Sequence, residues 1–582
     1  MGVFIKPEWT NFIRVTCTRP WDWFGYAIGL SYLVFRRFSN KFYIKLMGKG
    51  HSGLKRWPEW LARGDYKVYQ ERGDLIFPNY TRSAQISFVT ELPKLYFDAN
   101  DPEGYFARHR WGVCLMAALE EESLAKIALE EALSWIRNAP EKQDAAWETY
   151  SSCERVVNLA VMLAAHPNLW VNLDTGKKKE ITLFFVESSS WIMSHLEYYG
   201  IKRTNNHILN NARALVVMGS LLCDEVMVER GLIIFSHMAK NLFQSGGFLR
   251  ERSSHYQCVV TNWLMDTLHF AYSLPMVSPR SLMAMSELEG LSIRVATATN
   301  SLVAALDGLN THIGDISPDS HPTTTLFRLR ILYPHFFLET GACLDKRQDD
   351  WLFVSSGRHQ LITCVMPSEY PFDYATHGHT DLGSFVWSYN RCPLLVDSGR
   401  TSYVSDETSR IQCGHIGHNM MTVNGLSPLS ESLLTNGYWR PKPYAKAIIS
   451  FEHKNANSFI IRHNGFSRIS GVKEQMRVVH IISDGIEVED TLEGVGNVEI
   501  DMYWHFAPEI LVLQEHSCAV GGADFQIHIE EESRGIAITH WEEYPYASAY
   551  GNIQKAYMRH TKRSVSLPWT LKTTMKVISC AE

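Results

Sequence analysis

The chain has 582 residues, well beyond the roughly 250–300 residues at which a single hydrophobic core stops growing, so we expect at least two domains. Hydrophobic residues make up 45% of the chain and charged residues 20%, which excludes a disordered chain and a bundle of membrane helices. The net charge of −6 lacks the basic bias typical of nucleic-acid-binding proteins. Because the chain as a whole is slightly acidic, an acidic polymer could bind only through a local patch of basic residues.

The N-terminal segment 1–100 is predicted to be mostly helical and to pack on the domain that follows. Its apolar run, 23–35, is shorter than the roughly 20 residues that span a bilayer, and it lies late for a secretory signal. We expect no transmembrane segment and a cytoplasmic location, with periplasmic or membrane-surface association as the alternatives. The 11 cysteines form no C-x-x-C pair, which favours reduced, buried thiols.

Between residues 101 and 335 the apolar residues recur every three or four positions, which predicts helices. The pattern is clear in four segments: 110–139, 154–166, 181–200 and 205–222. Short loops that contain Gly, Pro or Asn separate these segments, and such spacing favours antiparallel helix pairs.

From residue 336 to residue 582 the hydrophobic period changes to two, with turn residues every eight to twelve positions. The alternation is clear in 350–357, 476–494 and 525–533. This pattern is typical of an antiparallel β-sandwich. The segment 313–330 is rich in Pro and Asp and is predicted to link the two domains, with the boundary near residue 335.

A polar stripe begins the helix predicted over 205–222. Helix capping explains one asparagine at a helix start but not several together. Asn206, His207 and Asn210 share one helix face, and a polar face on an apolar helix should meet either a cleft or a hydrogen-bonded network. Both interpretations remain open.

A tyrosine lies among charged residues in the segment GGFLRERSSHYQCVV, residues 246–260. A single tyrosine is usually structural. Here Arg250 and Arg252 lie near Tyr256 in the sequence, and nearby cations would favour its phenolate over a reference pKa of about 10.

Two histidine-rich segments, 375–399 and 415–425, flank the ends of predicted strands. His379, Asp397 and His418 offer two imidazoles and a carboxylate, a set of ligands that suits zinc. His377 lies two residues before His379, so an extended chain points both side chains the same way. The alternative is a set of separate surface histidines, because the chain has 24 of them.

With these motifs in this order, the chain resembles the heparinase II/III-like polysaccharide lyases. The resemblance runs from about residue 147 to residue 425 and rests on WETYSSCERVVN, NNHILNNARAL, ERSSHY, HGHTDLGSF, LLVDSG and HNMMTVNG. It implies an N-terminal (α/α) toroid, an incomplete barrel, followed by an antiparallel β-sandwich. The toroid would span 101–335 and the sandwich 336–582.

The resemblance also implies roles for individual residues. Asn206 and His207 would bind a uronate carboxylate, Tyr256 would exchange protons, and His377 would act as a second acid or base on the opposite face of the sugar. His379, Asp397 and His418 would hold a structural zinc or another divalent metal. Further substrate contacts are expected from Arg203, Glu251, Arg252 and Tyr403.

The expected function is therefore β-elimination of a uronate-containing polysaccharide or oligosaccharide. One alternative is a non-catalytic glycan-binding or exopolysaccharide-assembly protein on the same scaffold. Another is a toroid glycoside hydrolase, which would need two carboxylates across a cleft. The helical half offers Glu148, Glu154 and Glu251 for that purpose, and nothing in the sequence pairs them.

Overall fold

The computed structural model describes Leu75, Phe77 and most of residues 110–579. Within that range the described part leaves out 113, 115–117, 119–120, 143, 200–203, 275–277, 307–310, 318–345, 366–376, 404–405, 429–430, 434–438, 442–448, 456, 522–524 and 535. The predicted N-terminal segment 1–100, apart from those two residues, the apolar run 23–35, Arg203 and the predicted boundary near 335 lie outside the described residues.

Helices form the first half of the described chain, as the three-to-four-residue period predicts. They are α5 (Glu122–Arg137), α6 (Thr149–Ala165), α7 (Pro167–Val171), α8 (Thr175–Ser194), α9 (His207–Leu221), α10 (Glu225–Leu242), α11 (Ser254–Ala271) and α12 (Pro279–Ala305), with a 3-10 turn at Ala145–Trp147. Polar side chains cap several N-termini: Asp174, Asp224 and Ser253 each accept a hydrogen bond from a backbone N–H of the first turn.

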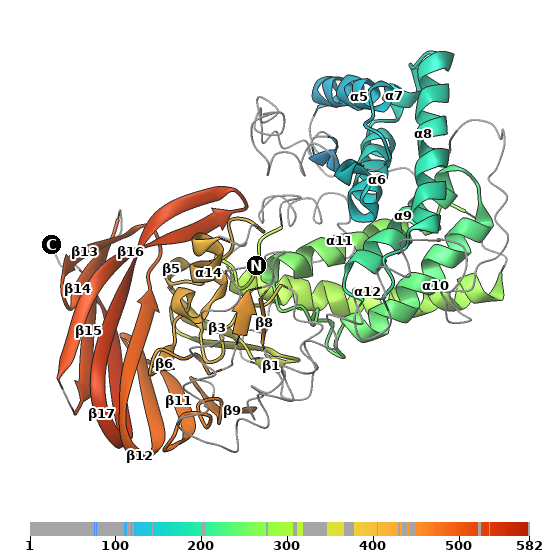
Figure 1. Cartoon of the computed structure of the whole chain (residues 1–582). Coiled ribbons are helices and arrows are strands. Elements are labelled where there is room, and N and C mark those ends of the chain that lie inside the picture. The colour runs from blue at the N-terminus through green and yellow to red at the C-terminus, as the bar shows by residue number, and fades with distance from the viewer. Residues whose placement is uncertain are drawn as a thin grey trace.

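Helix α9 is the centre of this helical part. It packs against α6, α8, α10 and α11, and α12 closes the layer against α10 and α11 (Figure 1). Every side chain of α6 is buried, as is every side chain of α9 after His207. A helix buried on all sides needs neighbours all round, so these two helices form the core of the toroid.

Strands make up the second half. They are β1 (Lys346–Gln348), β2 (Trp351–Ser356), β3 (His359–Cys364), β4 (Val386–Tyr389), β5 (Cys392–Leu395), β6 (Met421–Val423), β7 (Glu431–Leu433), β8 (Trp439–Pro441), β9 (Ile449–Asn455), β10 (Ser458–His463), β11 (Val472–Ile482), β12 (Gly485–His505), β13 (Ile510–Gln514), β14 (Ser517–Val520), β15 (Phe525–Ser533), β16 (Ala537–Ala549) and β17 (Asn552–Ser579). A short helix, α14 (Glu407–Cys413), and a 3-10 turn, His415–Gly417, precede β6.

These strands form two main antiparallel sheets. The smaller has the order β1-β2-β3-β4-β5. The larger has the order β13-β14-β15-β17-β12-β11-β10-β9, with β16 paired to β17 and β6 paired to β12. Strand β17 carries the same in-out alternation as the strands predicted from the sequence, and it lies between β12 and β15.

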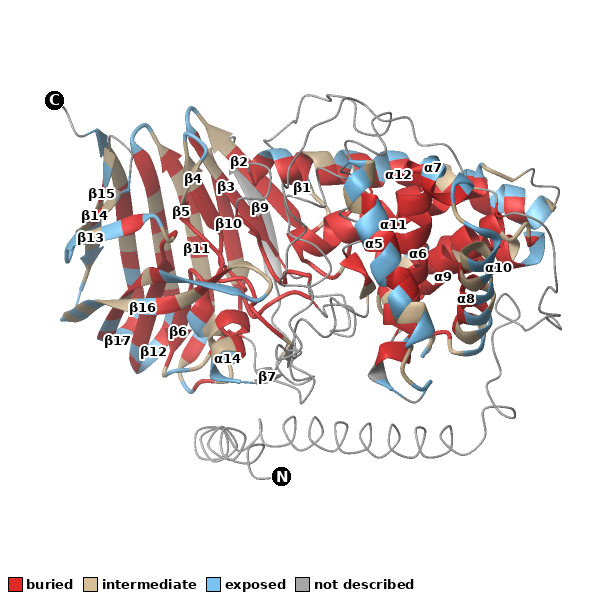
Figure 2. Ribbon diagram, turned by 90° about the horizontal axis from the view of Figure 1, so that it is seen from above, coloured by how far each residue is buried: buried red, intermediate tan, exposed pale blue. Residues whose placement is uncertain are grey.

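The small sheet lies between the helices and the large sheet, and strand β2 shows why. Trp351 and Phe353 belong to the core shared with the helices, whereas Leu352 and Val354 belong to the core shared with the large sheet. Because successive side chains of a strand point to opposite faces, an unbroken apolar run buries both faces. Figure 2 shows buried residues in the strands of both sheets, with intermediate and exposed residues among them toward β13, β14 and β15.

Contacts of Asp349 and Trp351 join the small sheet to the helical part. The carboxylate of Asp349, in the β1–β2 turn, accepts hydrogen bonds from the backbone N–H groups of Gly246 at 2.9 Å and Phe248 at 3.1 Å. The ring of Phe248 stacks on Trp351 with centroids 5.6 Å apart. The loop before α11 therefore has a defined position against the small sheet.

The predicted fold class is confirmed: an (α/α) toroid precedes an antiparallel β-sandwich. Among the helices that the structure describes, none combines the length and the hydropathy needed to cross a bilayer.

Candidate active site

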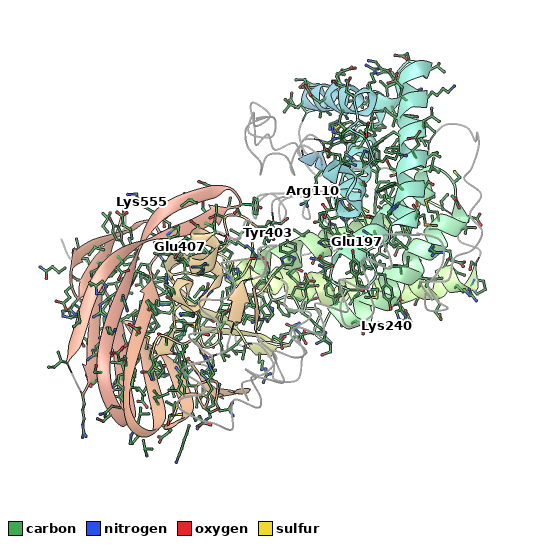
Figure 3. The ribbon with its side chains drawn as sticks, viewed as in Figure 1. Arg110, Glu197, Lys240, Tyr403, Glu407 and Lys555 are labelled. Carbon is green, nitrogen blue, oxygen red and sulfur yellow. The ribbon has the colours of Figure 1, made fainter. Side chains whose placement is uncertain are left out.

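The predicted site residues come from both halves of the chain and meet where the halves join. Tyr256 lies in the first turn of α11, where the Ser253 hydroxyl caps the helix by accepting from the Tyr256 N–H. His377 lies ahead of β4, and Tyr403 lies between β5 and α14. In Figure 3, Tyr403 lies where the sheets meet the helices, and Glu197 lies on the helical side.

Two aromatic rings form the middle of this cluster. The phenol of Tyr256 stacks on the imidazole of His377, with centroids 3.5 Å apart and planes 9° from parallel. The hydroxyl of Tyr256 lies 2.7 Å from that of Tyr403, which in turn lies 3.5 Å from Nδ1 of His377. The stack leaves no room for a sugar ring between Tyr256 and His377, so the two groups meet a substrate from one side.

A buried carboxylate, Asp315, holds the imidazoles in place. Its Oδ2 lies 3.0 Å from Nδ1 of His377, and its Oδ1 lies 2.9 Å from Nε2 of His379. Nη1 of Arg400 donates to both carboxylate oxygens, at 3.1 and 3.3 Å. Burial alone would raise the pKa of Asp315, but Arg400 and the two imidazoles hold that pKa well below its usual range. Asp315 therefore stays ionised and accepts from three donors at once.

The side-chain amide of Asn206 is buried at the start of α9. The residue is fully buried, and neither its Oδ1 nor its Nδ2 makes a hydrogen bond within the described residues. The amide does not cap α9; instead Oδ1 of Asn205 accepts from the His207 N–H at 3.2 Å. A buried amide without a partner is rare and indicates a ligand group that would complete its hydrogen bonds.

His207 begins α9 beside a second buried carboxylate. Its Nδ1 lies 2.9 Å from Oε1 of Glu197, and its ring packs on Tyr150 with centroids 4.6 Å apart. Burial would lower the pKa of His207, but the Glu197 carboxylate outweighs burial and raises that pKa. Asn211 donates to the other oxygen of Glu197 at 3.0 Å, which fixes the carboxylate. The pair therefore favours the protonated form of His207 at the start of the helix.

Glu251 links the amide to the aromatic pair. Its Oε1 accepts from the backbone N–H of Asn206 at 3.1 Å, and its Oε2 lies 3.7 Å from Nε2 of His377. Glu251 is fully buried. Asn206 and His377 are therefore neighbours of the same carboxylate, although they come from different domains.

Arg252 is the one predicted cation that the described residues bring to the site, and it is almost wholly buried. Its Nη1 donates to Asp381 at 3.2 Å, and its Nη2 lies 3.4 Å from the carbonyl oxygen of His379. Through these contacts the guanidinium binds the segment of the sheet domain that contains His379 and Asp381. The guanidinium therefore braces that segment, and the substrate contact expected from the sequence stays a prediction.

The three predicted metal ligands lie together. Nδ1 of His379 is 3.6 Å from Oδ1 of Asp397, and Nδ1 of His418 is 3.3 Å from Oδ2 of the same carboxylate. All three residues are buried, and their ligand atoms lie within 4.8 Å of one another. Nδ1 of His379 and both ring nitrogens of His418 make no hydrogen bond in the described part of the chain. Imidazoles buried in this way fit a metal ion, which would satisfy them.

The charge state of Asp397 suits a ligand. Burial would raise its pKa, but the imidazole of His418, followed by that of His379, holds the pKa well below its usual range. Nε2 of His379 is held by Asp315, an arrangement that orients a metal-binding imidazole through its second nitrogen. Asp315, His379 and Cys413 form a second group within 4.8 Å, so the thiol is a further candidate donor beside His379.

Sequence reasoning missed three residues of this site. Asp315 lies in a Pro- and Asp-rich segment that reads as a linker, Arg400 follows a turn, and Glu197 follows a helix end. Such positions are common for turn and surface residues. Asp315 lies three residues before the first proline of that segment, and nothing in the local sequence marks it as buried.

Comparison with known proteins supports the fold described above. Residues 350–572 match the family model described as heparinase II/III-like, C-terminal. A search of curated protein sequences gives no match. The family match covers the sandwich and not the helical part, so the likeness of the helical part rests on structure.

Two solved structures of heparinase III share the fold. For one, the TM-score is 0.62 at 13% identity, and the superposition covers 82% of this chain and 78% of that chain. For the second, a gene product also named heparinase III, the TM-score is 0.52 at 14% identity, covering 83% and 80%. This chain has the same fold as both of these structures over most of its own length.

Proposed function

Because residues 350–572 form a heparinase II/III-like C-terminal domain in a chain with the fold of heparinase III, we propose that the protein is a polysaccharide lyase. Its substrate would be a polysaccharide or oligosaccharide that contains a uronic acid, cleaved by β-elimination. The observation that carries the proposal is the buried, unpartnered amide of Asn206, one carboxylate away from the stacked Tyr256 and His377.

The first step is recognition of the uronate carboxylate. The amide Nδ2 of Asn206 would donate to one carboxylate oxygen, and the cationic ring of His207 would balance the charge. Removing the proton at C5 adds negative charge to that carboxylate, and buried donors stabilise such charge far better than water does. The burial of Asn206 and the raised pKa of His207 support this assignment.

The second step is proton transfer by Tyr256. As a phenolate it would take the C5 proton; the electron pair forms the C4–C5 double bond, and the C4–O4 bond breaks. The phenol would then return the proton to the leaving O4, which gives an unsaturated uronate and a new chain end. A positioned acid or base of this kind contributes about 100- to 10,000-fold to the rate.

Tyr403 and His377 would assist Tyr256. The hydroxyls of Tyr403 and Tyr256 lie 2.7 Å apart, and a hydrogen bond donated by Tyr403 would stabilise a phenolate at Tyr256. The guanidinium of Arg400 lies 4.4 Å from the ring centroid of Tyr403 and keeps a positive charge nearby. We assign His377 to the same side of the sugar as Tyr256, because the stack of the two rings argues against the opposite-face base expected from the sequence.

A metal ion, which we propose to be zinc, would be held by His379, Asp397 and His418. It would supply structural support: fixing His379 fixes the segment that carries His377. The elimination itself uses groups of this chain and needs no metal-bound water.

The decisive experiment incubates the purified protein with heparin, alginate and unsulfated uronate polymers, together with their oligosaccharides. A lyase generates the ultraviolet absorbance of an unsaturated uronate with at least one of them. The matched variant is Tyr256→Phe, which keeps the ring stack and removes the phenolic oxygen. If the folded, metal-replete protein gives no unsaturated product with any of these glycans, the proposal is wrong.

A hydrolase receives less support from the described acids. Glu154 is buried in an ion pair with Arg213 at 2.8 Å, and Glu251 is fully buried against Asn206. A non-catalytic glycan-binding protein would keep its affinity in Tyr256→Phe and would release no unsaturated product. The same assay therefore separates both alternatives from a lyase.

A further inference from the structure

A second group of metal-ligand residues lies on the large sheet, apart from the residues discussed above. His540 and Glu542 are two positions apart on β16, so they point to the same face. His560, on β17, is the direct antiparallel partner of His540 and shares that face. Three donor side chains are thus brought together by the register of one strand pair.

The donor atoms converge on one point. Oε1 of Glu542 is in close contact with Nε2 of His540 and lies 3.1 Å from Nδ1 of His560. The two imidazole rings have centroids 4.8 Å apart, and all three ligand atoms lie within 4.8 Å of one another. Ligands about 2.0–2.2 Å from a tetrahedral zinc lie at comparable separations.

The neighbouring strand β12 holds the more buried imidazole in the orientation that a ligand needs. Nε2 of His560 lies 2.9 Å from Oδ1 of Asp501, and the ring stacks on Tyr503 with centroids 4.6 Å apart at 21°. Nδ1 is then directed toward Glu542. A histidine that binds a metal through one nitrogen almost always has the other nitrogen held by a carboxylate, carbonyl or water.

We propose that His540, Glu542 and His560 bind a divalent cation of the zinc class. Two imidazoles and one carboxylate form a ligand set known for zinc, and a fourth position would remain for water. The side chains of His540 and Glu542 are 46% and 39% exposed, so ions reach the site from solvent. None of the three residues belongs to the buried group around Asp397.

A bound ion would clamp β16 to β17 below the hairpin that joins them. The hairpin reaches the active site: Tyr403 donates its backbone N–H to the hydroxyl of Tyr550 at 3.1 Å, and Gly551 donates to the carbonyl of Thr401 at 2.9 Å. The clamp would therefore stabilise the hairpin that supports Tyr403. This consequence for catalysis rests on the proposed function, whereas the metal site does not.

Zinc binding to the full-length protein tests the proposal. The protein is stripped with a chelator, titrated with zinc by calorimetry, and analysed for metal content per chain by mass spectrometry. His540→Gln should lower the zinc content by one ion per chain. Asp501→Asn, which removes the carboxylate behind His560, should weaken that site about 10- to 100-fold.

The chain offers a matched control on β15. His528 and Glu530 have the same two-residue spacing, with Nε2 and Oε1 3.5 Å apart, but Lys576 stands opposite His528 in the register. His528→Gln should leave zinc content and affinity unchanged, and His418→Gln should remove only the buried site. Equal zinc content and affinity in wild-type protein and His540→Gln would overturn the proposal, whatever the lyase assay shows.

Discussion

The ring of Tyr256 lies parallel to the ring of His377, centroid to centroid at 3.5 Å, although one belongs to the toroid and the other to the sheet domain. The contact exists only when the two domains are docked. Any rotation of one domain on the other would separate the phenol from its neighbours. The geometry of the candidate site therefore depends on how the two domains dock as well as on local structure.

Asn206→Ala should separate activity from stability. Within the described residues the side-chain amide makes no hydrogen bond, so removing it should take two unsatisfied polar atoms out of the interior and leave the free energy of unfolding unchanged or higher. If the amide binds the uronate, kcat/KM falls about 100- to 1,000-fold, as for loss of a transition-state donor. Denaturant unfolding and lyase rates measure the two effects.

The control for that variant is the adjacent residue. Asn205→Ala removes the cap on the His207 N–H and should lower the free energy of unfolding by about 1 kcal/mol, with a much smaller loss of rate. If the two variants lose the same activity, the amide of Asn206 has no special role.

Tyr403→Phe should slow turnover and shift the pH profile. The substitution deletes the hydrogen bond to the phenolic oxygen of Tyr256, and a hydrogen bond to a charged group contributes about 1.5–3 kcal/mol, or roughly 10- to 100-fold in rate. Without this hydrogen bond the phenolate of Tyr256 would form at a higher pH than in the wild-type protein. The rising limb of the plot of rate against pH should therefore shift to higher pH.

Tyr550→Phe serves as the comparison for Tyr403→Phe. It too removes a tyrosine hydroxyl next to the site, but that hydroxyl accepts from the backbone N–H of Tyr403, whereas the hydroxyl of Tyr403 lies 2.7 Å from that of Tyr256. Its rising limb should stay in place. A shift of similar size in both variants would argue against a phenolate at Tyr256.

Glu197→Gln should move the alkaline decline of kcat/KM to lower pH. Glu197 raises the pKa of His207 against the effect of burial, and the cation is lost as pH rises through that raised pKa. Without the carboxylate, His207 loses its proton earlier, so binding of the uronate weakens at lower pH. Measuring kcat/KM against pH for both proteins tests this.

The same pair makes stability depend on pH at both ends. The raised pKa of His207 adds stability that is complete below its unfolded pKa and is lost as pH rises through the folded value. The lowered pKa of Glu197 adds stability that is present above its unfolded pKa and is lost as pH falls through the folded value. Glu197→Gln should therefore destabilise the protein most between these limits, as urea midpoints across the pH range would show.

Asp315→Asn should weaken metal binding and catalysis together. The carboxylate accepts from His377, His379 and Arg400, so an amide in its place would remove the negative charge that faces Arg400 and would turn an N–H donor toward one of the two imidazoles. Loss of such a support typically lowers metal affinity about 10- to 100-fold. Metal content and lyase rate should fall in parallel.

Asp174→Asn provides the same chemical change at an exposed helix cap. Asp174 accepts from the Lys177 N–H, and asparagine caps a helix nearly as well, so stability and metal content should stay unchanged. If Asp315→Asn leaves metal content and stability unchanged, as Asp174→Asn should, then Asp315 does not support metal binding and catalysis together.

Local pattern was enough for the architecture. The three-to-four-residue period of 110–139 and the alternation of 476–494 reflect which side of each element is buried, and residues close together in the sequence are enough to reveal it. The sequence also named Asn206, Tyr256, His377 and the three metal ligands, because their motifs occur in a recognisable order.

The partners of these residues were decided by the tertiary structure. No local pattern links Asp315 to Arg400, or assigns Arg252 to Asp381, since each pair is joined only after the two domains dock. The stack of Tyr256 on His377 arises in the same way, whereas His540 meets His560 through the register of β16 on β17. The sequence alone gives the type of each residue and the local periodicity. The distance between two side chains that are far apart in the sequence depends on how all the chain between them folds.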